Sequence, residues 1–411
     1  MKNKFKVSSL FLILVSSSAS AQSLYKIGNE QEEPLPLKWI VGANLIYDDN
    51  AVPGGPVKDS SFAINPYVGV SYVTNDPQTT LSVGARLGLI YYFDRSAAFG
   101  GDDIESQSRV TVFFERNVSE RLRFTSSSYV AYELEPDYSY GYATSRQLGA
   151  YFTWQTDNSI GYRWSERFAT STGIRLTGTN YSDSPNNDRF AYELYNQFRY
   201  QLDPQTVLTS EYRIAQTVAS GAASDSQDQF LTVGVERLFS ATTSGVVSAG
   251  AQFRDVDDGD SQVSPFFQLA LNSQLTEAFS VRAFTRYSME TYDTILLHPN
   301  PAIGLVEFDD RRTLRVGISA DYVISPTLSL FSGIDYIPAS FQEGRSVSTP
   351  PFTGAIADVD DDLFNAYIGV SVEFNDFITG TLSYNYTDSS SDSIGRDYTR
   401  NRVSVGVSAA F

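Results

Sequence analysis

Apolar and polar residues alternate with a period of two along nearly the whole chain from Trp39 to the C-terminus. Residues 81–89 and 402–411 show the same alternation as the clearest segment, 313–324. There Leu, Val, Ile, Ala, Tyr and Ile occupy one face, and Thr, Arg, Gly, Ser and Asp occupy the other. Strict alternation over many segments predicts half-buried β-strands, and no segment sustains the 3.6 period of a helix.

Two kinds of connection alternate between these segments. Short ones are rich in Asn, Asp, Pro and Ser, as tight hairpins require, and comprise residues 74–78, 117–121, 165–167, 203–205, 240–244, 274–278, 325–327 and 375–376. Longer, more acidic ones comprise residues 50–60, 97–105, 134–140, 182–188, 219–226, 256–260, 294–307, 339–361 and 387–396. Short turns on one rim and long loops on the other are typical of outer-membrane barrels, with periplasmic turns and extracellular loops.

We therefore predict an all-β fold, a transmembrane antiparallel up-and-down β-barrel of about 18 strands, give or take about two. An even number of strands places both termini on the periplasmic side. A β-propeller is the alternative architecture for such a spacing, but it requires shorter strands and a recurring blade signature, which this sequence lacks.

The composition agrees with a sheet that is wet on one face and apolar on the other. Aromatic residues make up 14% of the chain, although the hydrophobic fraction is only 42%. Aromatic side chains are also expected in girdles at the two membrane interfaces. On the loop side these are Tyr47, Tyr72, Tyr91, Tyr132, Tyr181, Tyr287, Tyr292, Tyr336, Tyr384 and Tyr386, and on the turn side Trp164, Phe168, Phe239, Phe279, Phe374 and Phe377.

The N-terminus predicts export. Lys2, Lys4 and Lys6 precede an apolar run over 7–15 and the small-residue site Ala19-Ser20-Ala21, the pattern of a secretory signal peptide. We expect a signal peptide over 1–21, a short periplasmic segment over 22–38 and an outer-membrane barrel over 39–411. The chain has no cysteine, so no lipoprotein anchor follows the cleavage site and no disulfide framework is available.

Trp39–Asn50, with the sequence Trp-Ile-Val-Gly-Ala-Asn-Leu-Ile-Tyr-Asp-Asp-Asn, resembles the first strand of a β-barrel porin family. The resemblance would extend to Phe411 and is specific only at Asp48-Asp49-Asn50. It implies a porin-like outer-membrane barrel, and some members of the family are encoded beside exopolysaccharide machinery. The last strand resembles the signal read by the barrel-assembly machinery through its terminal Phe411, but it carries Ala409 where an aromatic residue is frequent.

The chemistry of the sequence argues against an enzyme. With one histidine and no cysteine, zinc sites and thiol nucleophiles are excluded, and His298 lies in a loop with no nucleophile pattern nearby. We expect no cofactor, no resident metal and no nucleic-acid partner. Acidic clusters at 102–103, 255–260, 309–310 and 358–362 are interpreted as a solvated, repulsive rim, with calcium binding as the alternative.

Charged residues on the polar face of the strands are the candidate functional residues. Charges on the lipid face are costly at mid-depth, so this face should line the interior. The predicted pore-lining residues are Arg86, Arg109, Arg123, Arg175, Arg199, Arg213, Glu193, Glu211, Glu236, Arg254, Arg282, Arg286, Arg315, Asp321, Asp335 and Arg402, together with Glu115, Glu290 and Glu373. They could tune ion selectivity in an aqueous pore, or they could close the lumen with salt bridges.

Three functions are consistent with this pattern. The first is a porin-like channel for passive diffusion of small polar solutes, narrowed by residues 339–361 or by the apolar stretch Ile295-Leu296-Leu297. The second is a conduit for exopolysaccharide export, for which the inward aromatic residues Tyr67, Tyr129 and Tyr195 are suitable. The third is a non-conducting structural or adhesive barrel. Expected partners are outer-membrane lipid, lipopolysaccharide, the assembly machinery and the solute or polysaccharide, and a homo-oligomer is left open.

Overall fold

The computed structural model describes residues 35–51, 53, 58–76, 78–93, 104–134, 150–182, 188–221, 223–257, 259–291, 294–348 and 352–411. Among these residues, no helix is long and apolar enough to cross a bilayer. The strands are β1 (Leu35–Asp48), β2 (Ser61–Asp76), β3 (Thr79–Tyr92), β4 (Ile104–Asn117), β5 (Leu122–Glu133), β6 (Tyr151–Arg163), β7 (Phe168–Tyr181), β8 (Arg189–Asp203), β9 (Thr206–Ala219), β10 (Ser226–Ser240), β11 (Thr243–Val256), β12 (Gln262–Thr276), β13 (Phe279–Met289), β14 (Ile295–Leu297), β15 (Leu305–Ser325), β16 (Leu328–Tyr336), β17 (Ala339–Ser346), β18 (Val359–Glu373), β19 (Ile378–Ser391) and β20 (Tyr398–Ala410).

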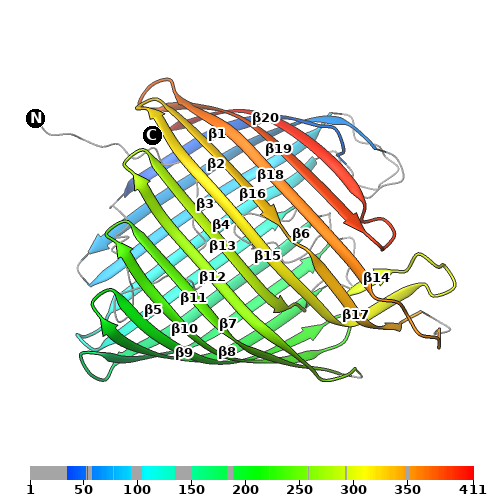
Figure 1. Ribbon diagram of the computed structural model, residues 1–411. Coiled ribbons are helices and arrows are strands. Elements are labelled where there is room, and N and C mark those ends of the chain that lie inside the picture. The colour runs from blue at the N-terminus through cyan, green and yellow to red at the C-terminus, as the bar shows by residue number, and fades with distance from the viewer. Residues whose placement is uncertain are drawn as a thin grey trace, which may run out of the picture.

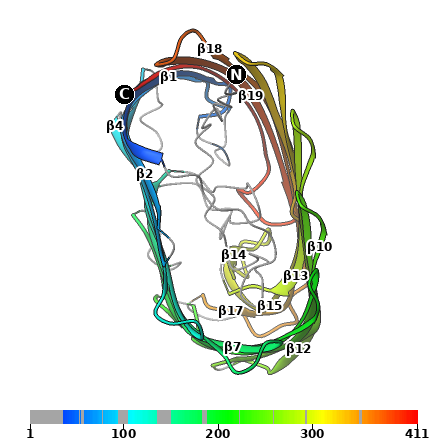
Figure 2. The same ribbon diagram turned by 90° about the vertical axis from the view of Figure 1, so that its left-hand side faces the viewer.

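The strands form one closed antiparallel barrel. Each wall strand pairs with its neighbour in the chain, and β1 pairs with β20 to complete the ring. β14 and β17 lie outside this order, because the wall runs directly from β13 to β15 and from β15 through β16 to β18. The barrel therefore has 18 strands, which confirms the predicted fold and strand number. Figure 1 shows the tilted strands from the side, and Figure 2 looks along the barrel and shows an oval ring.

The alternation of side chains explains why these segments form strands of a barrel. In β1, the outward side chains of Trp39, Val41 and Leu45 are about half exposed, at 50%, 52% and 48%. Asp48 has the opposite parity, faces inward and is buried. Register pairing carries the same inner and outer faces around the ring, since directly opposed residues lie on one face of a sheet. The outer face therefore presents mainly Val, Leu, Ile and aromatic side chains, and most of the charged residues of the wall face inward.

The barrel is closed by the strand end that carries the resemblance to a known family. Arg400 Nε of β20 donates to both carboxylate oxygens of Asp48, at 3.0 and 2.9 Å, and both side chains are buried. Asp49 accepts a hydrogen bond from the Asn401 amide at 2.7 Å, and the Asn50 amide donates to the Thr399 carbonyl at 3.0 Å. The Asp-Asp-Asn sequence thus joins the first strand to the last.

The short turns lie where the sequence predicts them, but the start of β1 and two of the long loops differ from the prediction. β1 begins at Leu35, before the expected Trp39, with a register shift between Leu35 and Lys38. Residues 294–307 and 339–361, expected as loops, contain β14 and β17 and part of β15. Their apolar residues pack into a small core, which supplies the burial that makes these strands stable.

Two of the tyrosines expected in the loop-side girdle lie elsewhere. Tyr72 lies four residues before the end of β2 at a short turn, so it belongs to the turn side. Tyr181 is buried on the inner face, opposite Tyr151, because its position in β7 has the parity of the polar residues. Tyr292 lies outside the described residues. The signal peptide, the segment up to residue 34 and Asp102-Asp103 also lie outside them.

The two larger clusters of buried apolar residues both lie toward the loop-side end of the barrel. One cluster, at the loop-side ends of the first strands, comprises Ala51, Ala63, Ile90, Tyr92, Leu134 and Ala150. The other comprises Leu296, Ile303, Val306, Phe308, Ala339, Phe341 and Val359, with Ile356 packed against it. The second cluster holds together the projection formed by β14, the start of β15 and β17, which extends beyond the barrel end in Figure 1.

Candidate functional site

The predicted pore-lining residues all lie on the inner face of the barrel. Register places Arg86 opposite Arg109, Arg175 opposite Glu193, and Arg286 opposite Arg315. Continuing the same pairing around the ring places the remaining predicted arginines and carboxylates on this face. The inner wall is thus densely charged, with most of its arginines in contact with a carboxylate of a nearby strand.

The longest row of charges crosses four neighbouring strands at mid-height. Arg175 lies between two carboxylates, 2.7 Å from Asp157 of β6 and 2.7 Å from Glu193 of β8. Arg213 of β9 continues the row, 3.5 Å from the other oxygen of Glu193, and its guanidinium lies 3.9 Å from the ring centroid of Phe230. Arg213 also lies 4.0 Å from Glu211. Positive and negative charges therefore alternate along the wall.

A second group combines arginines with tyrosines on β2 to β6. The Arg86 guanidinium lies 3.9 Å from the ring centroid of Tyr67 and donates to Asn65 at 2.9 Å. Arg109 donates to Glu133 at 2.8 Å and lies 5.5 Å from the ring centroid of Tyr129. Cation–π contact and ion pairing hold both guanidinium groups close to the wall.

Two further pairs lie toward the short-turn end of the barrel. Arg199 of β8 reaches across to Glu236 of β10 at 2.7 Å, and both residues are buried. Arg123 of β5 forms an ion pair with Glu115 of β4. Breaking one partner of such a buried pair leaves an unpaired buried charge, so these pairs fix the side chains firmly in place.

The most compact charged group surrounds Glu290, at the loop-side end of β13. Arg315 donates to both Glu290 oxygens at 2.7 and 2.9 Å, Arg311 lies 3.5 Å away and Arg286 lies 3.3 Å away. Nearby, Arg254 donates to the Glu290 carbonyl at 2.7 Å. Arg286 is the most accessible member, since 35% of its side chain is exposed.

The remaining predicted residues lie apart from one another on the inner face and do not form a single cluster. Arg282 lies across from Ser319, close enough to Asp321 to interact electrostatically with it. Asp335 lies opposite Gly317, and Arg402 donates to Asn385 at 3.2 Å. Several partners on the same face were not predicted from the sequence, namely Asp48, Glu133, Asp157, Asp228, Arg311 and Arg400. All six lie in strands, and parity alone would have found those other than Asp157, whose neighbours are polar on both faces.

Inward aromatic rings lie against glycines of the adjacent strand. A Cβ atom placed on Gly42, Gly173 or Gly333 would lie 2.4–2.5 Å from a ring atom of the tyrosine directly opposite, which is Tyr67, Tyr195 or Tyr367. Phe284 and Phe331 make the same contact with Gly317 and Gly369. Because glycine has no side chain, each ring can lie along the wall instead of pointing toward the barrel axis.

Residues 294–308 and 339–348, which we call the cap, contact loops from well-separated parts of the ring. Ser393, between β19 and β20, donates to the Leu297 carbonyl at 2.8 Å. On other strands, Arg189 of β8 donates to Thr294 at 3.3 Å, and the backbone of Ser224, between β9 and β10, donates to Glu307 at 2.6 Å. Contacts with both β8–β10 and the β19–β20 connection place the cap over the loop-side mouth, and Figure 2 shows β14 within the outline of the ring.

Carboxylates at the base of the cap are buried at 309–310, which corrects the expectation of a solvated acidic rim there. Asp309, Asp310 and Asp361 are 6%, 1% and 1% exposed, and Asp361 is paired with Arg396 at 2.8 Å. The other aspartates of 358–362 are exposed, as expected. The physical reason is that β15 is covered on both faces here, since residues 306–311 are all buried, whereas β18 buries only alternate residues. Among the described residues, no group of three or more His, Cys, Asp or Glu could hold a metal ion.

Burial also changes the titration of these carboxylates. Burial raises the pKa of Asp309, although Arg345 and a backbone amide of Asp260 act in the opposite direction. Burial, together with Asp260, Asp310 and Asp309, raises the pKa of Glu343. Glu343 has a left-handed backbone with φ of 58°, which is uncommon outside glycine, and its carboxylate accepts a hydrogen bond from Gln262.

No family model matches the sequence, and no curated protein is similar to it. Among solved structures, OccAB4 of Acinetobacter baumannii is 12% identical with a TM-score of 0.43, covering 92% of this chain and 99% of that chain. The outer membrane protein OpdK of Pseudomonas aeruginosa is 10% identical with a TM-score of 0.46, covering 91% and 99%. OccK2 of the same organism, solved with glucuronate, is 10% identical with a TM-score of 0.46, covering 91% and 98%.

Proposed function

We propose that the chain is a porin-like channel of the bacterial outer membrane, through which small polar solutes diffuse passively without any catalytic residue. One observation carries this proposal: the ring closes with 18 strands, with a charged inner face and an apolar outer face. Barrels of roughly eight strands are filled by their own side chains, whereas those of roughly 16–18 leave an aqueous channel.

The arrangement of the inner side chains supports an aqueous interior. The ion pairs of Arg109, Arg175 and Arg213 run along the wall between neighbouring strands. Rings such as Tyr195 lie over glycines of the next strand. Both features draw bulky side chains toward the wall and leave fixed charges of both signs facing the interior, where they would set ion selectivity. This favours the open lumen over closure by salt bridges.

The cap is the constriction in this proposal. It crosses the loop-side mouth and has its own apolar core around Phe341 and Leu296, so it is a folded part of the mouth and not a tethered loop. The expected narrowing segments, residues 339–361 and Ile295-Leu296-Leu297, supply β17 and β14 of this cap. Leu296 is buried there, whereas Leu297 is 44% exposed.

Insertion in the outer membrane follows from the same structure. Lipid and the tails of lipopolysaccharide would surround the apolar outer face, after a signal peptide over 1–21 directs export. Residues 22–34 would then lead into β1 from the periplasm, since β1 begins at Leu35. The backbone of Phe411 pairs with Trp39 and completes the β1–β20 pairing. Its side chain is 64% exposed and would be accessible to the assembly machinery.

Planar-bilayer recording of the refolded chain tests the proposal. We expect discrete conductance steps, and larger steps when residues 296–304 and 340–346 are each replaced by glycine–serine linkers. A matched control replaces the short turn at 241–242, on the opposite rim, with the same linker chemistry. Absence of conductance in both the native chain and the cap variant would support a non-conducting barrel. Unchanged step size in the cap variant would exclude the cap as the constriction.

Export of a polysaccharide is a second candidate function, favoured by the inward tyrosines. Tyr67 and Tyr129 lie beside Arg86 and Arg109, so flat rings and guanidinium groups occur together on one wall. Such surfaces stack on sugar rings and donate to their hydroxyl or carboxylate oxygens. Current through the cap-linker variant should then be blocked by added acidic oligosaccharide, and Tyr67→Ala with Tyr129→Ala should relieve the block. Block that is equal in both proteins would count against this candidate.

A further inference from the structure

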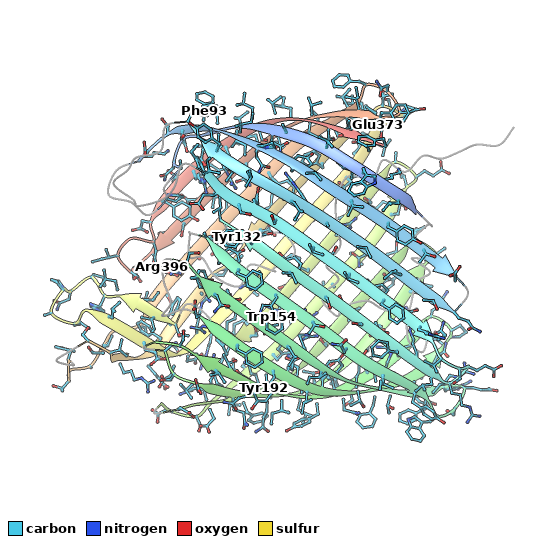
Figure 3. All side chains as sticks on the ribbon, turned by 180° about the vertical axis from the view of Figure 1, so that it is seen from behind. Phe93, Tyr132, Trp154, Tyr192, Glu373 and Arg396 are labelled. Atoms are coloured by element: carbon cyan, nitrogen blue, oxygen red, sulfur yellow. The ribbon has the colours of Figure 1, made fainter. Side chains whose placement is uncertain are left out.

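The outer face of β5 to β8 carries a stripe of uncharged polar side chains where a bilayer-facing wall should be apolar. The stripe comprises Ser126 and Ser128 of β5, Thr156 and Asn158 of β6, Thr172 of β7, and Asn196 of β8. Register shows that they share a face with outward residues such as Ile160, Ile174 and Leu194, which are 55%, 38% and 51% exposed. Figure 3 looks at this wall from outside, with Tyr132, Trp154 and Tyr192 marking it.

The stripe lies near the middle of the membrane thickness. Asn158 is five residues from the short-turn end of β6 at Arg163, and Asn196 is at the midpoint of β8. Five residues of a strand tilted by about 40° rise about 13 Å, roughly half of an apolar band about 25 Å tall. Headgroups of lipid or lipopolysaccharide therefore lie too far away to satisfy these groups.

The polar side chains are partly satisfied by one another. Ser126 donates to the Asn158 amide oxygen at 2.8 Å, and the Asn158 amide nitrogen donates to Thr156 at 2.9 Å. The Ser128 and Thr156 hydroxyls lie 3.1 Å apart, and the Asn196 amide nitrogen donates to Thr172 at 2.5 Å. Asn196 Oδ1 is buried against the wall and accepts no hydrogen bond from the described part of the chain. Hydroxyl and amide groups thus remain that hydrocarbon cannot satisfy.

Other walls lack such a stripe at the same depth. The central outward positions of β15 are Val316, Ile318 and Ala320, and those of β20 are Val403, Val405 and Val407. Single hydroxyls occur at Thr285, Ser332 and Ser210, and β4 carries Ser106 and Ser108 toward its loop-side end. An extended group with two amides on four adjacent strands is therefore a local feature of one sector, about 19 Å wide at about 4.8 Å per strand.

We propose that the outer face of β5 to β8 is a seam between copies of this chain within the membrane. The partner must present polar groups at mid-membrane depth, and a second copy does so because the same stripe lies at the same height. The stripe has donors and acceptors but no charge, so it can pair with itself without repulsion. Interhelical contacts in membranes use the same chemistry of amide and hydroxyl groups.

Site-specific photocrosslinking in outer membranes tests the seam. Benzoylphenylalanine at Asn196 should give adducts of two copies of the exported chain, identified by mass spectrometry. The matched control places the same residue at Ile318, which is also outward, central and 50% exposed, on β15. Adducts only with lipid at position 196, adducts with a different protein, or equal dimer yields at 196 and 318 would each overturn the proposal.

A double substitution provides a second test of the proposed seam. Asn158→Leu with Asn196→Leu should lower the oligomer-to-monomer ratio in mild detergent about tenfold, the effect of losing on the order of one to two hydrogen bonds. Thr285→Val with Ser332→Leu on other walls should leave the ratio unchanged. Folding is verified independently by the heat-dependent gel shift of the barrel. If the leucine variant folds with an unaltered ratio and higher thermal stability, the stripe faces lipid and the seam is excluded.

Discussion

Asp48 and Arg400 form a buried ion pair that joins the first barrel strand to the last, with Arg400 Nε 2.9 and 3.0 Å from the two oxygens of the Asp48 carboxylate. Their Cα atoms belong to strands that meet only when the barrel closes, since 352 residues separate them. Asp49 and Asn50 add bonds to Asn401 and Thr399 across the same strand pair. The conspicuous Asp-Asp-Asn strand end therefore serves barrel closure and is not part of the inner site.

Replacing Asp48 by asparagine should destabilise the barrel strongly. Arg400 would remain buried, 3% exposed, without its carboxylate. Loss of one partner of a buried pair costs about 3–5 kcal/mol. Urea unfolding of the refolded protein in micelles, followed by tryptophan fluorescence, measures the change. Lys58→Gln is the control, because Lys58 makes a more exposed pair with Asp49 and should cost no more than about 1 kcal/mol. Similar losses for both variants would contradict the assigned role of the buried pair.

A methyl group at Gly173 should move Tyr195 away from the wall. The added Cβ would lie 2.4 Å from the tyrosine ring, whose hydroxyl now donates to Asp157 at 2.7 Å. Gly173→Ala should therefore cost about 1–3 kcal/mol of stability by overpacking and narrow the interior. Single-channel conductance should fall in this variant and recover in Gly173→Ala with Tyr195→Ala. No recovery in the double variant would show that the ring is not what narrows the channel.

Replacing Arg286 by glutamine should shift ion selectivity toward cations. Arg286 is the most exposed arginine of the Glu290 group, and Glu290 keeps Arg311 and Arg315 as partners after the change. The wall thus loses one accessible positive charge while the buried ion pair remains. Reversal potential in a salt gradient measures the shift. Arg237→Gln, on the outer face beside Phe239, is the matched control and should leave the potential unchanged. An equal shift in both variants would argue against selectivity from the inner wall.

The direction of each side chain in the wall could be predicted from the sequence, because a period of two leaves only two faces. Arg175 and Glu193 were assigned to one face in this way, and the structure places them side by side at 2.7 Å. Their third partner, Asp157, could not be assigned. It lies within Thr156-Asp157-Asn158-Ser159, where both faces are polar, so the alternation disappears where the outer stripe crosses β6.

Pairing partners and the cap depend on contacts that the local pattern does not contain. Register decides that Arg199 meets Glu236 on the strand beyond its neighbour, and closure decides that Asp48 meets Arg400. The cap was expected as two long loops because Pro and Gly interrupt its alternation. Its strands are stable only through long-range packing of Leu296 and Phe308 against Phe341, which neither segment can provide alone.

The cap should close more firmly in acidic solution than in neutral solution. Burial raises the pKa of Asp309, and burial with neighbouring carboxylates raises that of Glu343, so the folded cap holds these protons more tightly than an open chain does. Below the ordinary carboxyl pKa range, Asp309 and Glu343 are protonated in both the closed and the open cap, so they add no free-energy penalty to closure. As pH rises through the raised pKa values, ionisation costs more in the closed cap, so closure weakens toward neutrality. Glu343→Gln should remove part of this dependence.

The absence of native cysteine allows a direct measurement of cap opening. Maleimide labelling of Leu296→Cys, buried in the cap, reports opening, and Leu297→Cys, 44% exposed in the native chain, corrects for the pH dependence of the thiol reaction itself. The ratio of the two rates should rise from the ordinary carboxyl pKa range up to pH 8, and rise less when Glu343→Gln is added. A ratio that is flat in the native background, or equally steep with Glu343→Gln, would show that these carboxylates do not control the cap.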